Sequence, residues 1–202
     1  MLLLVGLGNP GPGHAGNRHN LGFMAVDEIV RRHRFGTPRA RFHGLVAEGE
    51  VAGHKIIALE PATYMNDSGR AVEAAAHFYK LAPEQVVVIH DEVDLPPGRL
   101  KVKRGGGAGG HNGIRSLDGH IGQDYRRVRI GIGHPGVKEL VQPYVLQNFP
   151  AEEVDDWVAP LIDAVAQTIP LLLAGDAPAF MSEVARRCAP PDDKAPKDKA
   201  KD

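Results

Sequence analysis

The sequence predicts one α/β domain of three layers, α/β/α, in which a twisted mixed sheet is flanked by helices. Two short, mostly apolar runs, 2–6 and 85–90, are typical of central strands buried on both faces. Segments with helical spacing alternate with these runs, which favours parallel strands joined by helices. Between them, residues 43–51 and 54–60 form a hairpin pattern that turns at Gly53, so antiparallel strands are expected as well.

The first helix is expected after the glycine-rich turn that follows the first strand. Asn17 is a suitable N-cap, apolar residues recur on one face over residues 18–34, and Gly36 ends the pattern. A second helix, over residues 68–80, is Ala-rich and is broken by Pro83.

The second half of the chain continues the alternation. Residues 99–103 alternate so that one face is basic, and residues 125–132 predict a half-buried strand with a basic outer side. Asn112 is expected to cap a helix over residues 113–121. Two more helices are expected, over 151–174 with a kink at Pro160 or Pro170, and over 177–187.

The composition fits one domain, residues 1–188, followed by a disordered tail, residues 189–202. Of the 202 residues 43% are hydrophobic, enough for a core, whereas the tail holds almost only charged residues, Pro and Ala. Cys188 is the only cysteine, so an intramolecular disulfide is excluded and a cytoplasmic setting is favoured. The apolar N-terminus lacks a basic leader, and we expect neither a signal peptide nor a membrane span.

The net charge of -1 indicates no partner by itself, but the charges are unevenly distributed. Cations dominate residues 95–135, whereas residues 151–184 contain acidic residues and neither Lys nor Arg. Such polarity suits a face for a polyanion. Ordinary solvated faces are the simpler explanation from charge alone, because folding can scatter these residues.

The turn GLGNPG, residues 6–11, formally matches a dinucleotide-binding fingerprint after a strand. Pro10 and Pro12 prevent a helix from starting there, and no acidic residue ends a second strand at the required distance. No such cofactor is therefore expected. Asn9 lies at the carboxyl end of the strand, where open α/β sheets bind ligands. A turn asparagine with positive φ is equally compatible with the pattern.

A second glycine-rich loop, residues 105–113, follows the basic segment. It is not a P-loop, because no Lys-Ser or Lys-Thr follows the glycines. Glycines allow close approach of backbone to a ligand or movement as a lid, although a flexible surface loop has the same composition. The adjoining His111 and Asn112 favour a functional loop.

His19 and Asp91 have the chemistry of a general base and its supporting carboxylate. His19 follows the N-terminal glycine turn, and Asp91 ends the second buried strand. A carboxylate that fixes the imidazole tautomer and stabilises the imidazolium allows histidine to activate water. The sequence contains no metal-ligand spacing and no Gly-x-Ser-x-Gly elbow, so we expect water as the nucleophile and no metal.

Four motifs, in this order, carry a resemblance to a known family: GLGNPGPGHAGNRHNLGF, PATYMNDSG, HDEVDLPPGRLKVKRGGGAGGHNG and YRRVRIGIGHP. Over residues 1–187 the sequence resembles the bacterial-type peptidyl-tRNA hydrolases. The resemblance implies that His19 is the catalytic base and that Asp91 supports it. It also implies that Asn9 helps to distinguish the peptide-bearing end of tRNA from a free aminoacyl end.

The resemblance further implies substrate-binding residues, which are His14, Tyr64, Met65, Asn66, Lys103, His111, Asn112 and Arg129. The segment 64–66 matches the wall of the crevice that holds the tRNA 3′ end and the peptide, and Asn112 matches a substrate-binding amide. Lys103 and Arg129 match positions that grip tRNA phosphate, with His111 as a secondary candidate. His14 stands where many relatives carry tyrosine, so we expect a changed contact there.

The implied function is hydrolysis of the ester between a peptide and the 3′-terminal ribose of tRNA, which recycles the tRNA. We expect a cytoplasmic monomer without cofactor, with Asn9, Asn66 or backbone N–H groups at the oxyanion. One alternative is an RNA-binding module that has lost catalysis, as in plant-organelle intron-splicing relatives; the presence of His19, Asn9 and Asp91 argues against it. The other is a nicotinamide-dependent oxidoreductase, for which we expect no cofactor binding.

Overall fold

The computed structural model describes residues 1–189 of the chain, and within them a seven-stranded sheet has the order β2-β3-β4-β1-β5-β7-β6. β1 pairs in parallel with β4 and β5, and β5 with β7, whereas the β2–β3, β3–β4 and β6–β7 pairs are antiparallel. The strands are β1 (Leu2–Gly6), β2 (Arg39–Arg41), β3 (Gly44–Val51), β4 (His54–Pro61), β5 (Val86–Glu92), β6 (Leu100–Arg104) and β7 (Arg126–Gly131).

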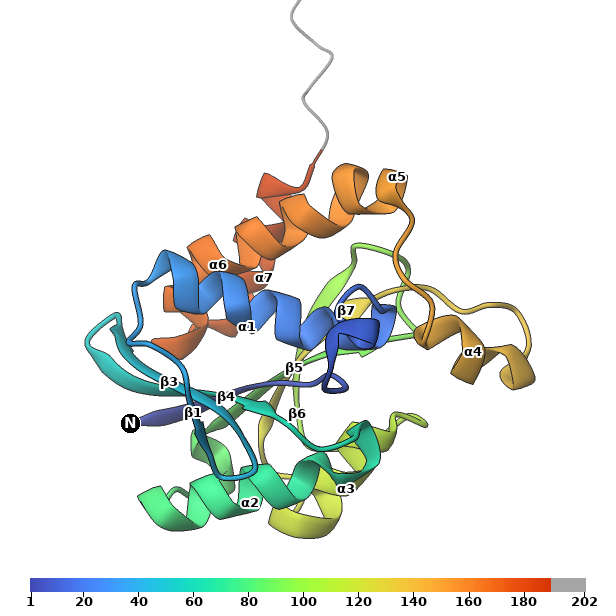
Figure 1. Cartoon of the computed structure of the whole chain (residues 1–202). Helices are drawn as coiled ribbons and strands as arrows, with labels where there is room; N and C mark the ends of the chain where they lie inside the picture. The colour runs from blue at the N-terminus through green and yellow to red at the C-terminus, as the bar shows by residue number, and fades with distance from the viewer. Residues whose placement is uncertain (190–202) are drawn as a thin grey trace, which may run out of the picture.

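Helices cover both faces of this sheet (Figure 1). One apolar cluster lies between the sheet and α1, α6 and α7, and a second lies between the sheet and α2 and α3. The predicted three-layer α/β/α domain with a mixed sheet is therefore confirmed. The helices are α1 (Leu21–Arg32), α2 (Ser68–Tyr79), α3 (Asn112–Ile121), α4 (Val141–Val145), α5 (Ala151–Glu153), α6 (Ala159–Leu173) and α7 (Ala177–Arg187).

Short helical turns connect these elements. Most are 3-10 turns, but one is a π turn, which interrupts the helix predicted over residues 151–174 just before Pro160. At Pro170 the helix continues, and the His33 imidazole lies 2.8 Å from the Ala166 carbonyl, whose usual donor is absent in a proline. The turns are η1 (Pro12–His14), η2 (Arg18–Asn20), η3 (Met65–Asp67), η4 (Pro83–Gln85), η5 (Lys138–Leu140) and the π turn η6 (Val154–Val158).

The start of the first helix differs from the prediction. The turn η2 comes first, and α1 begins only at Leu21. The Asn17 side chain does not cap a helix; its Nδ2 donates instead to Oδ1 of Asn148, at 2.8 Å. A partner distant in sequence has replaced the local capping interaction.

The basic outer side predicted for residues 125–132 is wrong. β7 lies between β5 and β6 and is largely buried. Arg127 is only 2% exposed and donates to Asp118 at 2.8 Å and to the Gly107 carbonyl at 2.9 Å. Arg126 donates to the Leu172 carbonyl at 2.9 Å. These partners come from α3, α6 and the glycine-rich loop, and no local pattern shows them.

One helical run, residues 151–173, is long and apolar enough to cross a membrane by length and composition. Half of its most apolar window, 50%, is buried inside the fold. It packs against α1 and the sheet, as the core helix of a layered domain does. The expected absence of a membrane span stays a prediction. The same holds for the boundary between domain and tail, since residues 190–202 lie outside the described part.

α1 approaches the ends of the central strands at a glycine. A Cβ atom at Gly22 would stand 2.3 Å from the Ile89 carbonyl oxygen and 2.4 Å from the Leu7 amide nitrogen. Gly6 on β1 faces the same contact, with its Cβ position 2.5 Å from the Gly22 oxygen. Backbone packs directly on backbone here, and this contact sets the distance between the sheet and the segment that precedes α1.

We predict that Gly22→Ala lowers the free energy of unfolding by about 3 kcal/mol, because an added methyl group must push α1 away from two strand ends. Urea unfolding monitored by circular dichroism measures the change. Gly119→Ala in α3 is the matched control, since its Cβ position meets nothing within 4 Å. That change is expected to stabilise by about 0.5–1 kcal/mol. Equal effects of the two substitutions would contradict the close-packing argument.

Candidate active site

A cleft of about 680 Å³ opens where β1, β4 and β5 reach their carboxyl ends. Each strand places a predicted residue on it: Asn9 follows β1, Met65 follows β4, and Asp91 is the second-last residue of β5. His19, from η2, completes this floor. Parallel strands end at one edge of the sheet, so residues far apart in sequence meet there.

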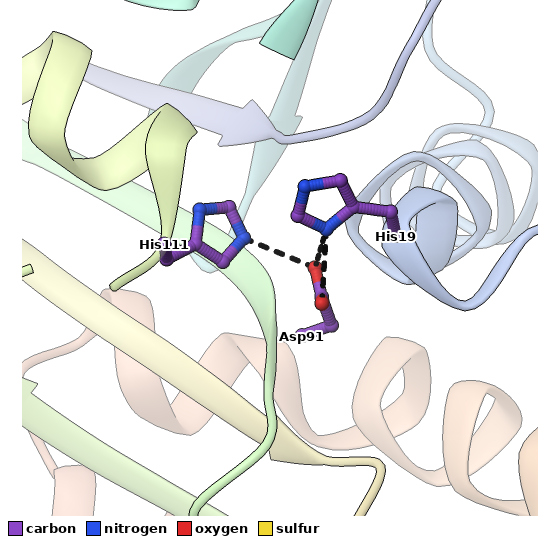
Figure 2. Close-up of side chains that lie close together, drawn as sticks. All are labelled: His19, Asp91 and His111. Atoms are coloured by element: carbon purple, nitrogen blue, oxygen red, sulfur yellow. Dashed lines mark hydrogen bonds and ion pairs between the residues drawn. The ribbon is translucent and has the colours of Figure 1, made fainter. Parts of the chain in front are cut away.

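His19 and Asp91 form a hydrogen-bonded pair (Figure 2). The Nδ1–H of His19 donates to the Asp91 carboxylate, with Nδ1 3.0 Å from both oxygens. Both side chains are buried, at 8% and 2% residue exposure. Because Nδ1 carries the hydrogen, Nε2 has a lone pair and lies on the far side of the ring from Asp91.

His111 donates to the same carboxylate from the other side (Figure 2). Its Nε2 is 3.0 Å from Oδ1 of Asp91, and its ring centroid is 4.7 Å from that of His19. Its Nδ1 accepts from the N–H groups of Gly113 and Ile114, at 3.1 and 3.3 Å. His111 is therefore the N-cap of α3, and the predicted cap, Asn112, is wrong. The two backbone donors also fix the hydrogen of His111 on Nε2.

Burial and charge act in opposite directions on this cluster. Burial alone lowers the pKa of His19, but the charge and hydrogen bonds of Asp91 outweigh it and raise that pKa above 6.5. Burial would raise the pKa of Asp91, yet the two imidazoles hold it far below 3.8. Burial lowers the pKa of the neighbouring His90 to about 3. His90 stays neutral and donates from Nδ1 to the Asp91 backbone carbonyl, at 2.7 Å.

The orientation of the Asn9 amide is set by backbone groups. Oδ1 of Asn9 accepts from the Met65 N–H at 2.8 Å. The Asn20 amide holds the Asn9 backbone from both sides, accepting from its N–H and donating to its carbonyl, each at 2.9 Å. With Oδ1 occupied, the Nδ2 hydrogens of Asn9 are the part of the amide that remains to donate. Within residues 1–189 they make no hydrogen bond.

The trio His19, Asp91 and His111 offers three possible metal-ligand atoms within 4.8 Å of one another. The donor chemistry does not fit a metal. A neutral imidazole that binds a metal through one nitrogen carries its hydrogen on the other. Nδ1 of His111 already accepts two backbone N–H bonds, so coordination through Nε2 would leave the ring without any hydrogen or break the cap of α3. The cluster is better suited to holding protons than an ion.

The structure brings most predicted site residues together. Those on the cleft are Asn9, His19, Tyr64, Met65, Asn66, Asp91, His111 and Asn112. Tyr64 is 69% exposed and Met65 is buried, so the segment 64–66 forms both rim and floor. Asn112 is exposed, with its Oδ1 accepting from Arg115 at 3.1 Å.

Three predicted residues do not line the cleft. Nδ1 of His14 lies 2.8 Å from Oδ1 of Asn17, in the turn before η2. Lys103 is exposed on the edge strand β6. Arg129 is partly exposed, and its Nε donates to Glu92, a cleft residue, at 3.0 Å. The roles predicted for these residues stay predictions.

One wall of the cleft was missed by sequence reasoning. It comes from residues 134–146, for which no element was predicted, and includes Val141, Val145 and Leu146 of α4 and its C-cap. The apolar side chains Val137, Leu140 and Leu146 are exposed here. A short helix that begins after a Pro-Gly pair and contains Pro143 has no periodicity to reveal it. The only signal in the sequence was the number of apolar residues in a segment too short and irregular for a core helix.

Comparison with known proteins identifies the family. The sequence model of the family described as Peptidyl-tRNA hydrolase matches residues 3–192. This chain belongs to the peptidyl-tRNA hydrolase family. The match to peptidyl-tRNA hydrolase spans the whole cleft, including the wall formed by α4. The resemblance inferred from the four motifs is confirmed.

Relatives agree with this assignment over nearly their whole length. A peptidyl-tRNA hydrolase of Parvibaculum lavamentivorans is 58% identical over 202 residues, which cover 100% of this chain and 98% of the relative. That of Acidiphilium cryptum is 59% identical over 186 residues, covering 92% and 96%. A crystal structure of peptidyl-tRNA hydrolase from Acinetobacter baumannii matches with a TM-score of 0.85 at 42% identity, covering 91% of this chain and 94% of that one.

We predict that Asp91→Asn lowers the pKa of His19 below 6.5. The carboxylate is what raises that pKa, and without its charge the lowering of the pKa by burial prevails. Titration of the His19 imidazole by NMR measures the shift. Asp124→Asn is the control, because that exposed carboxylate pairs with Arg104 instead. An unchanged or raised His19 pKa in Asp91→Asn would contradict the balance described here.

Proposed function

We propose that this peptidyl-tRNA hydrolase uses His19 as a general base that activates water to attack the ester between the peptide and the tRNA 3′-terminal ribose. The observation that carries the proposal is the hydrogen bond from Nδ1 of His19 to Asp91. It leaves Nε2 to accept the proton of a water in the cleft, and Asp91 stabilises the imidazolium that results. An ester needs only such a base and donors for the oxyanion, so no metal or cofactor enters the mechanism.

Asn9 is the better candidate for the oxyanion among the groups predicted. Its Oδ1 is occupied by the Met65 N–H, so its Nδ2 is presented as a preoriented donor beside His19. A fixed dipole of this kind stabilises developing negative charge without reorganising. Asn66, by contrast, is exposed at the rim. Asn66 and Asn112 line the cleft, which supports their pairing with the peptide and the tRNA end, and a substrate without the first peptide link would leave such groups unpaired.

Binding of the tRNA itself is assigned to cations outside the cleft. Lys103 lies exposed on β6 and has no ion pair within the described residues. Arg129 stands at the cleft border beside Glu92, and the exposed glycines of the loop allow close approach of the phosphate backbone. Contacts with phosphate position a duplex without reading its sequence, which suits an enzyme that acts on many tRNAs.

The proposal includes a cytoplasmic monomer that is not anchored to a membrane. The exposed apolar residues Tyr64 and Leu146 line the cleft, and Val137 and Leu140 belong to the same segment as Leu146. This position suits contact with the peptide of the substrate rather than with a second subunit. Cys188 is exposed and unpaired in the described part, which fits a reducing compartment.

We expect His19→Ala to lower kcat for N-acetyl-aminoacyl-tRNA by about 10²–10⁴-fold, the usual contribution of a general base. Binding of tRNA is expected to stay unchanged, because phosphate contacts lie elsewhere. Release of the N-acetyl-aminoacyl group at low salt measures the first, and a filter-binding titration the second. His77→Ala, an exposed histidine on α2, is the control. Wild-type activity in His19→Ala would refute the mechanism, and absence of hydrolysis by the wild-type protein would favour an RNA-binding module.

Lys103→Ala is expected to weaken tRNA binding and to reduce the slope of log Kd against log salt by about 1, because one phosphate contact is lost. Lys55→Ala is the matched control. Lys55 is also exposed but lies on β4, separated from β6 by three strands, and pairs with Glu48. Binding isotherms at several salt concentrations give both slopes. Identical slopes for the two variants would remove Lys103 from the tRNA interface.

A further inference from the structure

The residue before the proposed base is a buried arginine. Arg18 is 5% exposed, and its guanidinium lies between two aromatic rings, 4.6 Å from the centroid of Tyr144 and 5.0 Å from that of Phe149. Nη1 donates to the Asn148 carbonyl at 2.9 Å, and Nη2 pairs with Glu153 of α5. All these partners lie in the segment 144–153, which runs from the end of α4 to the end of α5.

The backbone joins the same two segments. The Arg18 N–H donates to the Gln147 carbonyl at 2.9 Å, and the Phe149 N–H donates to the Gly16 carbonyl at 3.0 Å. Asn17 and Asn148 form an antiparallel β-bridge, and their side chains are joined by a hydrogen bond of 2.8 Å. Hydrogen bonds of both backbone and side chains therefore join the turn that carries His19 to the segment after α4.

That segment continues directly from the apolar wall of the cleft. Val141, Val145 and Leu146 line the cleft, whereas Arg18 does not. The wall and the base thus line the same cleft, and Arg18, outside its lining, contacts the segment that continues the wall. A buried guanidinium outside the cleft lining therefore links the two segments.

We propose that Arg18 is a positioning residue that couples the α4 wall, which contacts the peptide, to the orientation of His19. The inference rests on the proposed role of His19 as the base. Contact of the peptide with Val145 then stabilises the arrangement in which Nε2 faces the ester, because the wall and the base move as one unit. A displacement of about 1 Å at a reacting group can lower a rate by about 10²-fold.

The side-chain chemistry supports a positioning role rather than one in stability. Only arginine offers a planar cation that stacks on two rings and still donates in fixed directions. Nε of Arg18 is also buried and has no acceptor within residues 1–189, which weakens the case for net stabilisation. A partly buried pair such as Arg18–Glu153 stabilises less than its charges suggest, because the guanidinium leaves water.

Arg18→Met tests the proposal, since it keeps the length of the side chain and removes the guanidinium. We expect kcat for N-acetyl-aminoacyl-tRNA to fall about 10- to 100-fold while KM changes by less than about 3-fold, because phosphate contacts are untouched. Arg32→Met is the matched control. Arg32 also pairs with an acid across the helices, Asp163, but has no link to α4. Its loss should lower the unfolding midpoint without changing kcat.

A double-mutant cycle measures the coupling itself. With a peptidyl-tRNA that carries an apolar peptide, the effects of Val145→Ala and Arg18→Met on kcat should deviate from their product by more than about 2-fold, the limit for independent sites. The cycle of Val145→Ala with Arg32→Met should show no such deviation. If Arg18→Met does not fold, Glu153→Gln takes its place, because it removes the ion pair and keeps an acceptor.

The outcomes separate this inference from the proposed mechanism. Independent effects of Arg18→Met and Val145→Ala, or equal losses of kcat in Arg18→Met and Arg32→Met, would overturn the positioning role while leaving His19 as the base. Full activity in His19→Ala would overturn the mechanism whatever Arg18 does.

Discussion

The carboxylate of Asp91 is the group on which the arrangement of the cleft depends. It is buried at the end of a central strand and receives hydrogen bonds from two imidazoles that belong to segments 72 and 20 residues away. A buried carboxylate without such donors would cost several kcal/mol. The N-terminal turn and the glycine-rich loop are therefore drawn to the same point. The hydrogen bonds that satisfy the Asp91 carboxylate are the same bonds that bring the two segments of the site together.

The strands and helices around the cleft fix the positions of the two imidazoles relative to Asp91. Parallel strands β1 and β5 end side by side, and α1 packs on their ends through Gly22 with no side chain between. His19 stands just ahead of that contact, so the strand ends fix its height above Asp91. On the other side, α3 fixes His111 through the backbone N–H groups of its first turn. The imidazole of His111 is thus oriented by backbone N–H groups together with Asp91, whereas that of His19 is oriented by its hydrogen bonds to Asp91.

Much of the fold and of the cleft could be predicted from the sequence. The wrong predictions concern features that local patterns do not show. Apolar runs and helical spacing suffice for the layers, and the end of β5 places Asp91 at the cleft. The cap of α3 could not be assigned, because Asn112 has the better intrinsic preference and His111 takes the position only through its bond to Asp91. Arg127 has the pattern of an exposed cation until Asp118 is seen beside it. The α4 wall has no periodicity at all. In the first two cases a tertiary contact overrides the local signal, and in the third the sequence carries no local signal.

The two edge strands have a further consequence, which concerns the behaviour of the protein at high concentration. A free strand edge can add a strand from another molecule, and cations on that strand oppose this. β2 carries Arg39 and Arg41, and β6 carries Lys101, Lys103 and Arg104. Both edge strands thus carry positive charge, and an edge strand of one molecule repels the edge strands of another. On β6 the cations that oppose self-association include Lys103, the residue proposed to bind tRNA phosphate, so under this proposal resistance to aggregation and attraction of substrate rest on the same side chains.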